Sequence, residues 1–196
     1  MIAIVDYGAG NLTSVKKALD FLGQECEITS TPEFVANANK VVLPGVGHFA
    51  STSALARSGL QNAIANAIGR GVPFLGICVG MQWMFEGSQE SPETNGLGLL
   101  PGKCERFPNS VKSPHVGWNQ LEISPSSRLF RDVPNKSFVY FTHSYRAPEA
   151  DATTARCEYG GNFSAAVERE HVFGVQFHPE KSGETGLKLL NNFCTL

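Results

Sequence analysis

The sequence lacks a long apolar segment and any cluster of basic residues. No stretch approaches the roughly 20 consecutive apolar residues that a membrane-spanning helix needs. The first residues, MIAIVDYG, lack the basic leader of a secretory signal peptide. Lysine and arginine together number 16 against 18 aspartates and glutamates, which gives a net charge of -2. We therefore expect a cytoplasmic protein that binds neither membrane nor nucleic acid, because no basic excess is available to neutralise phosphates.

Cysteines are few and scattered. They stand at positions 26, 78, 104, 157 and 194 and form no CxxC pair, so the sequence predicts neither a zinc knuckle nor a disulfide framework. In a reducing compartment most such cysteines are small buried hydrophobic residues, and Cys78 is weighed against that alternative. The histidines at 48, 115, 143 and 171 show no metal-ligand spacing such as HExxH. We expect no metal and no cofactor.

The first half of the chain alternates short apolar runs with amphipathic segments, a pattern that predicts an α/β fold. Expected strands are 2–5, 25–29, 40–43 and 72–77, and expected helices are about 12–22, 52–70 and 79–86. Asn11 or Thr13 is the expected cap of the first helix. This β-α-β order predicts a mainly parallel central sheet flanked by helices.

The composition changes from about residue 97, where Gly, Pro, Ser and Asn become frequent. Segments 137–142, 153–158, 164–169 and 172–177 are expected to be extended. We interpret them as additional, partly antiparallel strands of the same domain, because no linker-like stretch separates them. The prediction is a single domain over 1–196, closed by a final helix that Ser182 caps.

The segment Gly76-Ile77-Cys78-Val79-Gly80 has the form of a nucleophile elbow, in which a strand turns sharply into a helix. Glycines suit such a turn because it leaves no room for side chains beside the nucleophile. A cysteine at a helix N-terminus feels the positive end of the helix dipole, which favours the thiolate. The alternative is a buried cysteine in a turn whose glycines only serve packing.

A base for this cysteine is suggested by Val175-Gln176-Phe177-His178-Pro179-Glu180. In an extended segment His178 and Glu180 project to the same side, so the carboxylate can hold one imidazole nitrogen and leave the other for a thiol proton. A lone HxE is more often a surface pair at the end of a strand. The elbow makes the catalytic interpretation stronger because it supplies the missing nucleophile.

The loop Pro44-Gly45-Val46-Gly47 follows a predicted strand, and Cys78 follows another. Reactive groups in parallel sheets gather at the carboxyl ends of the strands. The two glycines permit peptide reorientation, so this loop could offer a backbone N–H to an oxyanion. By itself the motif is weak, since most PGxG loops are simple turns.

Taken with FHPE at 177–180, the segment GICVGMQ resembles the class I (triad-type) glutamine amidotransferases. DYGAGN at 6–11, PGVGHF at 44–49, PHVGWN at 114–119 and HSYR at 143–146 are similar to the glutaminase subunits of imidazole glycerol phosphate synthases. These blocks run in order through nearly the whole chain. Departures from the family pattern are His48, Val116 and Trp83, none of which belongs to the triad.

The resemblance implies roles at the matching positions. Cys78 would attack the carboxamide of glutamine, with His178 as base and then acid and Glu180 orienting its ring. The backbone N–H groups of Val79 and Val46 would form the oxyanion hole, the latter after its loop reorients. Substrate would be bound by Gly45, Gly47, Gln82, Glu90, Ser144 and Tyr145.

The resemblance also implies a partner, a (β/α)8-barrel synthase subunit that receives the ammonia. Trp118, Asn119, Tyr140 and Lys181 stand where the family lines that interface, although Trp118 and Tyr140 could instead belong to the core. Other functions left open are a glutaminase for another acceptor, such as that of pyridoxal phosphate synthesis, a catalytically dead binding module and a cysteine peptidase.

Overall fold

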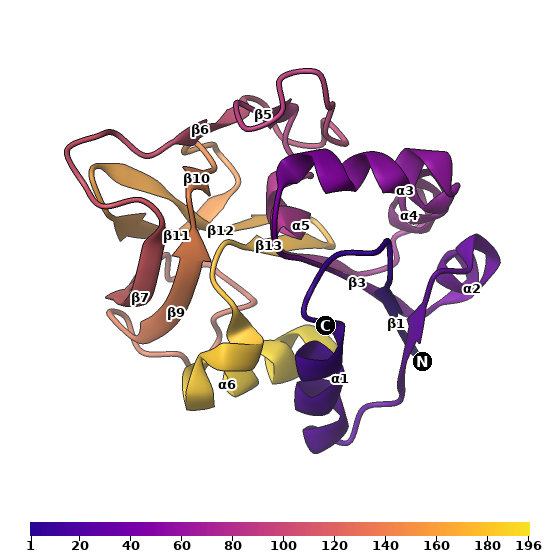
Figure 1. Cartoon of the computed structure of the whole chain (residues 1–196). Helices are drawn as coiled ribbons and strands as arrows, with labels where there is room; N and C mark the ends of the chain where they lie inside the picture. Colours follow the sequence, from indigo (N-terminus) through magenta and orange to yellow (C-terminus); the bar gives the residue numbers. More distant parts are fainter.

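A mixed eight-stranded sheet forms the centre of the computed structural model, which describes all residues from 1 to 196 (Figure 1). The strand order is β2-β1-β3-β4-β13-β12-β11-β8. The parallel part comprises β2 (Cys26–Thr29), β1 (Ile2–Val5), β3 (Lys40–Gly45), β4 (Phe74–Cys78) and β13 (Val172–Val175). The antiparallel part comprises β12 (Asn162–Arg169), β11 (Thr153–Glu158) and β8 (Glu122–Ile123). The predicted α/β class, with antiparallel strands added by the second half, is confirmed.

Helices lie on both faces of the parallel strands. Figure 1 shows α1 (Leu12–Phe21) and α6 (Gly183–Thr195) together on one side, with α3 (Ser53–Arg57) and α4 (Leu60–Gly69) on the other. The short helix α2 (Pro32–Asn37), which we did not predict, packs against α4. No helix of this chain has both the length and the apolar character needed to cross a membrane.

Two predicted helices are shorter than expected. The segment 52–70 is divided by Gly59, whose φ of 81° is left-handed, and a 3-10 turn (Phe49–Thr52) precedes it. The helix after Cys78, α5, spans only Val79–Gln82. It stops because the carbonyls of residues 83 to 85 accept hydrogen bonds from the N–H groups of residues 97, 98 and 100 instead of continuing the helix.

The second half of the chain also builds two small sheets. Strands β7 (His115–Gln120) and β9 (Phe138–His143) form an antiparallel ribbon of their own, so the predicted strand 137–142 does not join the main sheet. Strands β10 (Tyr145–Arg146), β6 (Lys103–Arg106) and β5 (Gly87–Ser88) form the other. Strands β5 and β10 were not predicted because two residues are too few for a periodic pattern, and β6 was not predicted because its sequence KCER contains no apolar run.

The predicted helix caps are wrong in detail. Asn11 and Ser182 occupy the N-cap positions of α1 and α6, but neither side chain makes a capping hydrogen bond. The hydroxyl of Ser182 instead donates to the carbonyl of His178 at 2.7 Å and accepts from the backbone N–H of Tyr140 at 2.9 Å. Ser182 therefore fastens the His178 segment to β9.

Candidate active site

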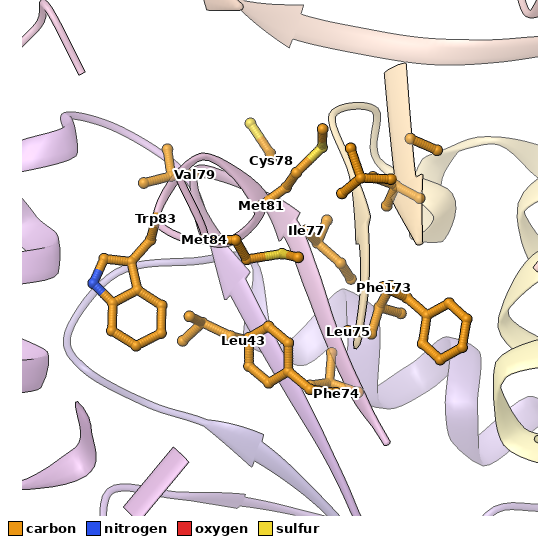
Figure 2. Packing of buried hydrophobic residues seen from close by; sticks show 14 of the residues in the cluster. Leu43, Phe74, Leu75, Ile77, Cys78, Val79, Met81, Trp83, Met84 and Phe173 are labelled. Atoms are coloured by element: carbon orange, nitrogen blue, oxygen red, sulfur yellow. The ribbon is translucent and has the colours of Figure 1, made fainter. Parts of the chain in front are cut away.

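Cys78 ends the buried strand β4 and caps helix α5, the position predicted for it. Its backbone has φ 54° and ψ −108°, a conformation that costs free energy for any residue with a side chain and that is concentrated at functional sites. Only 3% of the residue is exposed. Figure 2 shows its sulfur directed away from the core side chains Phe74, Leu75 and Met84. The thiol thus faces away from the packed interior.

The glycines around Cys78 are required by close packing. A Cβ on Gly76 would lie 2.6 Å from the carbonyl oxygen of Gly80, and one on Gly80 would collide with the carbonyl of Leu43. A Cβ on Gly45 in the adjacent strand β3 would lie 2.7 Å from the hydroxyl of Tyr7. The turn therefore brings three backbone segments closer than any side chain allows.

His178 and Glu180 form a buried pair. His178 Nδ1 lies 2.9 Å from Glu180 Oε1, and both side chains are only 1% exposed. The geometry differs from the extended segment that we predicted, because Pro179–Lys181 is a 3-10 turn. The turn therefore places the carboxylate next to the ring, and the alternation of side chains along a strand plays no part.

Charge around His178 favours its protonated form. Burial by itself lowers the pKa of His178, but the hydrogen bond to Glu180 and the attraction of nearby Cys78 and Glu180 outweigh it and raise the pKa to about 10. The second ring nitrogen, Nε2, is buried and has no hydrogen-bond partner. An imidazolium that is held by a carboxylate and lies beside a cysteine is the arrangement that a nucleophilic cysteine needs.

Gln176, for which the sequence predicted no role, contacts the nucleophile. Its side chain is fully buried, and its Nε2 donates to Cys78 Sγ at 3.6 Å. Its Oε1 accepts from Nε2 of Gln82 at 3.1 Å. The signal available in the sequence was a polar amide two residues before His178 in an otherwise apolar segment.

A cavity of about 240 Å³ opens at Cys78. It is lined by Val46, Gly47, Cys78, Val79, Gln82, Glu90, Pro114, Thr142, His143, Ser144 and Tyr145. The structure thus brings together the nucleophile, both predicted oxyanion residues and the predicted substrate residues, except that Gly45 does not line the cavity. Pro114, Thr142 and His143 were not predicted to line it. The cavity is smaller than the roughly 300–1,000 Å³ typical of drug-sized ligands, which suits a small molecule.

The loop after β3 is exposed in its middle and fastened at its end. Val46, Gly47 and His48 are exposed, and Gly47 has a φ of 96°. His48 Nδ1 accepts from the N–H of Ala50 at 3.1 Å, which caps the 3-10 turn. The N–H of Phe49 donates to Glu90 Oε2 at 2.8 Å. His48, a departure from the family pattern, therefore anchors the loop.

An exposed apolar face lies on the β7–β9 ribbon. Val116, Trp118 and Phe138 are each more than half exposed, so Trp118 does not belong to the core. Trp118 pairs with Tyr140 across the ribbon, with ring centroids 6.1 Å apart, and Lys181 Nζ lies 5.9 Å from the Tyr140 ring centroid. Three of the four predicted interface residues are thus neighbours. The fourth, Asn119, is partly buried and follows Trp118 in β7.

Metal binding has no support in the side-chain arrangement. No group of three or more His, Cys, Asp or Glu residues could hold a metal ion.

Comparison with known proteins relates almost the whole chain to one family. Residues 3–196 match the family model described as "Glutamine amidotransferase class-I". The chain is 48% identical over 198 residues to the imidazole glycerol phosphate synthase subunit HisH of Moorella thermoacetica, with 100% of this chain and 94% of that protein covered. It is 47% identical over 197 residues to the same subunit of Methanothermobacter thermautotrophicus, with 100% and 98% covered.

Solved structures share the fold at lower sequence identity. A crystal structure of a glutamine amidotransferase superimposes with a TM-score of 0.78 at 19% identity, covering 100% of this chain and 98% of the other. The structure of PurLQS from Thermotoga maritima gives a TM-score of 0.78 at 23% identity, covering 99% and 97%.

Proposed function

This chain belongs to the class-I glutamine amidotransferases, in the family of the HisH subunits of imidazole glycerol phosphate synthase, and we propose that Cys78, His178 and Glu180 carry out its glutaminase reaction. It is an enzyme subunit of histidine biosynthesis. The observation that carries the assignment of the triad is the buried His178–Glu180 pair, whose second ring nitrogen is buried without a partner in the neighbourhood of Cys78.

Cys78 is the proposed nucleophile. Its thiolate attacks the side-chain carboxamide carbon of glutamine, and His178 then gives its proton to the departing nitrogen. Ammonia leaves, and a glutamyl thioester remains on Cys78. Water attacks the thioester while His178 takes one of its protons, which releases glutamate and restores the thiolate. Glu180 keeps the imidazole oriented throughout by accepting from Nδ1.

The oxyanion formed in this attack needs two N–H donors. Val79 is the first residue of α5, so its N–H has no carbonyl partner within the helix and benefits from the helix dipole. Val46 lines the same cavity from the exposed loop. We propose that the Gly45–Gly47 loop turns its Val46 N–H toward the oxyanion when glutamine binds.

The amino-acid end of glutamine is proposed to occupy the remainder of the cavity. Glu90 offers a carboxylate for the α-ammonium group, and backbone groups near Gly47, Ser144 and Tyr145 complete the site. Both Nε2 hydrogens of Gln82 are used by protein acceptors, the carbonyl of Tyr145 at 2.9 Å and Oε1 of Gln176 at 3.1 Å. Only the carbonyl oxygen of Gln82 is therefore free to accept from the substrate.

A (β/α)8-barrel synthase subunit is the proposed partner, forming a heterodimer in the cytoplasm. It would receive the ammonia through an internal passage and form imidazole glycerol phosphate and AICAR. The exposed face of Val116, Trp118 and Phe138 supports a protein partner, since aromatic anchors are typical of interfaces. Release of free ammonia is wasteful, so glutamine hydrolysis should rise when the ligand-loaded partner binds.

The test is glutamine hydrolysis by the wild type and by Cys78→Ala, each with and without the ligand-loaded barrel subunit. We expect hydrolysis by the wild type that rises with the partner, and none by Cys78→Ala. Undiminished turnover in the variant would exclude Cys78 as the nucleophile. Equal wild-type rates with and without the partner would contradict the proposed activation but not the triad.

A further inference from the structure

A buried pair of histidines next to the cavity has no part in the reaction described above. His115 is in β7 and His143 in β9, directly opposite each other in the ribbon. His115 Nδ1 lies 3.2 Å from His143 Nε2, and both residues are buried. Buried imidazoles paired ring to ring are costly unless every nitrogen has a partner.

Hydrogen bonding at each end of the pair leaves one arrangement of protons. His143 Nδ1 lies 2.8 Å from the carbonyl oxygen of Tyr145, which only accepts, so Nδ1 carries the hydrogen. In neutral His143, Nε2 is then an acceptor, and His115 Nδ1 must donate to it. His115 Nε2 is left to accept from Asn119 Nδ2, which lies 3.4 Å away. Both rings are thus neutral Nδ1–H tautomers.

The surroundings hold this arrangement in place. His115 is stacked between Tyr159 and Phe141, with ring centroids 3.9 and 4.8 Å away. Burial lowers the pKa of His115 to about 4, and burial together with nearby His115 and His178 lowers the pKa of His143 to about 3. A neutral His143 adds no positive charge to the neighbourhood of the His178 imidazolium.

The Tyr145 carbonyl joins this pair to the nucleophile. It accepts from His143 Nδ1 and also from Gln82 Nε2 at 2.9 Å. Gln82 in turn donates to Gln176, whose Nε2 reaches Cys78 Sγ. A continuous series of hydrogen bonds therefore runs from Asn119, on the ribbon that carries Trp118, to the sulfur.

We propose that His143, kept in one tautomer by His115, is a positioning residue for glutamine hydrolysis: it fixes the Tyr145 carbonyl, which sets the Gln82 and Gln176 amides beside Cys78. This inference rests on the proposed glutaminase function. His143 acts through the amides and touches no reacting atom. Loss of His143 should therefore lower the rate by misplacing the substrate, since a displacement of about 1 Å can reduce the rate roughly a hundredfold.

Covalent geometry supplies a matched set of variants. Asn places an N–H donor on Cγ, where His143 has Nδ1, so His143→Asn keeps the bond to the Tyr145 carbonyl. Gln places its amide one atom further out, at the level of Nε2, so His143→Gln loses that bond. His143→Leu loses both bonds, and Phe163→Leu changes the same aromatic cluster, 5.4 Å from the His143 ring centroid, without removing a donor.

The experiment measures kcat/KM for glutamine, with the purified chain alone and with its synthase partner. It also measures the rate at which iodoacetamide, which needs no amide contacts, labels the Cys78 peptide. We expect kcat/KM to fall at least about tenfold in His143→Leu and His143→Gln and to stay within about threefold in His143→Asn and Phe163→Leu. Labelling should change much less than kcat/KM in every variant, since the amides do not position iodoacetamide and only the Gln176 contact to the sulfur is affected.

Three results would overturn the proposal: wild-type-like hydrolysis by His143→Leu, equal losses in His143→Asn and His143→Gln, or a parallel fall in iodoacetamide labelling, which would indicate a merely structural role. If His143→Leu does not fold, the comparison of His143→Asn with His143→Gln still tests the proposal.

Nitrogen NMR of labelled histidine should also find two neutral Nδ1–H rings in the wild type at neutral pH, and Nε2–H rings would contradict the proton arrangement. Absence of hydrolysis by the wild type with its partner would instead contradict the proposed function.

Discussion

The backbone N–H of Phe49 donates to Glu90 Oε2 at 2.8 Å, so a predicted substrate residue also anchors the end of the loop that carries Val46. One carboxylate is thus shared by the cavity and the loop. Glutamine binding at Glu90 and the position of the loop are therefore expected to depend on each other.

Replacement of Glu90 by Ala should weaken glutamine binding and release the loop. Loss of a hydrogen bond to a charged group costs about 1.5–3 kcal/mol, which corresponds to roughly a 10- to 150-fold rise in KM. Steady-state kinetics measure the effect, with exposed Glu86→Ala as a control from the same region. An unchanged KM would show that Glu90 does not hold the substrate.

Removal of the Cys78 thiol should lower the pKa of His178. Burial lowers this pKa, but the thiolate and Glu180 raise it to about 10, and Cys78→Ala removes the first of these two attractions. Proton NMR of the His178 ring, followed from pH 5 to pH 10, measures the shift. A titration at the same pH in both proteins would mean that the thiolate and imidazolium do not interact.

The raised pKa of His178 should also make the free energy of unfolding depend on pH in the alkaline range. The folded-state pKa of His178 lies above its ordinary value of 6.5, so the folded protein binds more protons between pH 6.5 and about 10. The stability that His178 contributes is present in full below pH 6.5 and is lost as the pH rises through about 10. Urea unfolding should show a smaller loss over this range for Cys78→Ala than for the wild type.

The buried pair of His115 and His143 should instead lower the free energy of unfolding as the pH falls below 6.5. The pKa values of His115 and His143 are lowered to about 4 and about 3, so the unfolded state binds more protons below pH 6.5. Their contribution is present above pH 6.5 and is lost as the pH falls, with a slope of up to about 1.4 kcal/mol per pH unit for each histidine.

Urea unfolding between pH 7 and pH 4.5 tests this slope. His143→Asn removes one of the two groups and should flatten the profile, whereas Phe163→Leu retains both and should keep the wild-type slope. Parallel profiles for His143→Asn and the wild type would show that His143 is not held neutral.

Trp118→Ala should separate partner binding from folding. Trp118 is 56% exposed, so its loss should change the free energy of unfolding by less than about 0.5 kcal/mol. A central aromatic anchor contributes at least about 2 kcal/mol to an interface, so binding of the synthase subunit should weaken by roughly 30-fold or more. Titration calorimetry measures this, with exposed Phe21→Ala on α1 as the control. Equal affinities would remove Trp118 from the interface.

Local patterns in the sequence predicted most of the parallel half of the fold. Buried runs such as Ile2–Val5 and Phe74–Cys78 are strands because they are apolar on both faces and end at turn residues. The elbow at Cys78 was predictable because its glycines are a direct consequence of local close approach. The short strands were not predictable, since they form by pairing with distant segments. The break at Gly59 was not predictable either, since a glycine inside a helical pattern does not by itself reveal a left-handed φ.

By itself the sequence determined the candidate nucleophile and its base, because Cys78 follows a strand and His178 stands two residues from Glu180. Only the tertiary structure decided what surrounds them. Gln82 meets Gln176 across 94 positions, and His115 meets His143 across 28. Such meetings depend on the order of strands in the sheet and on the pairing of β7 with β9, which arise from packing over the whole chain and leave no local pattern.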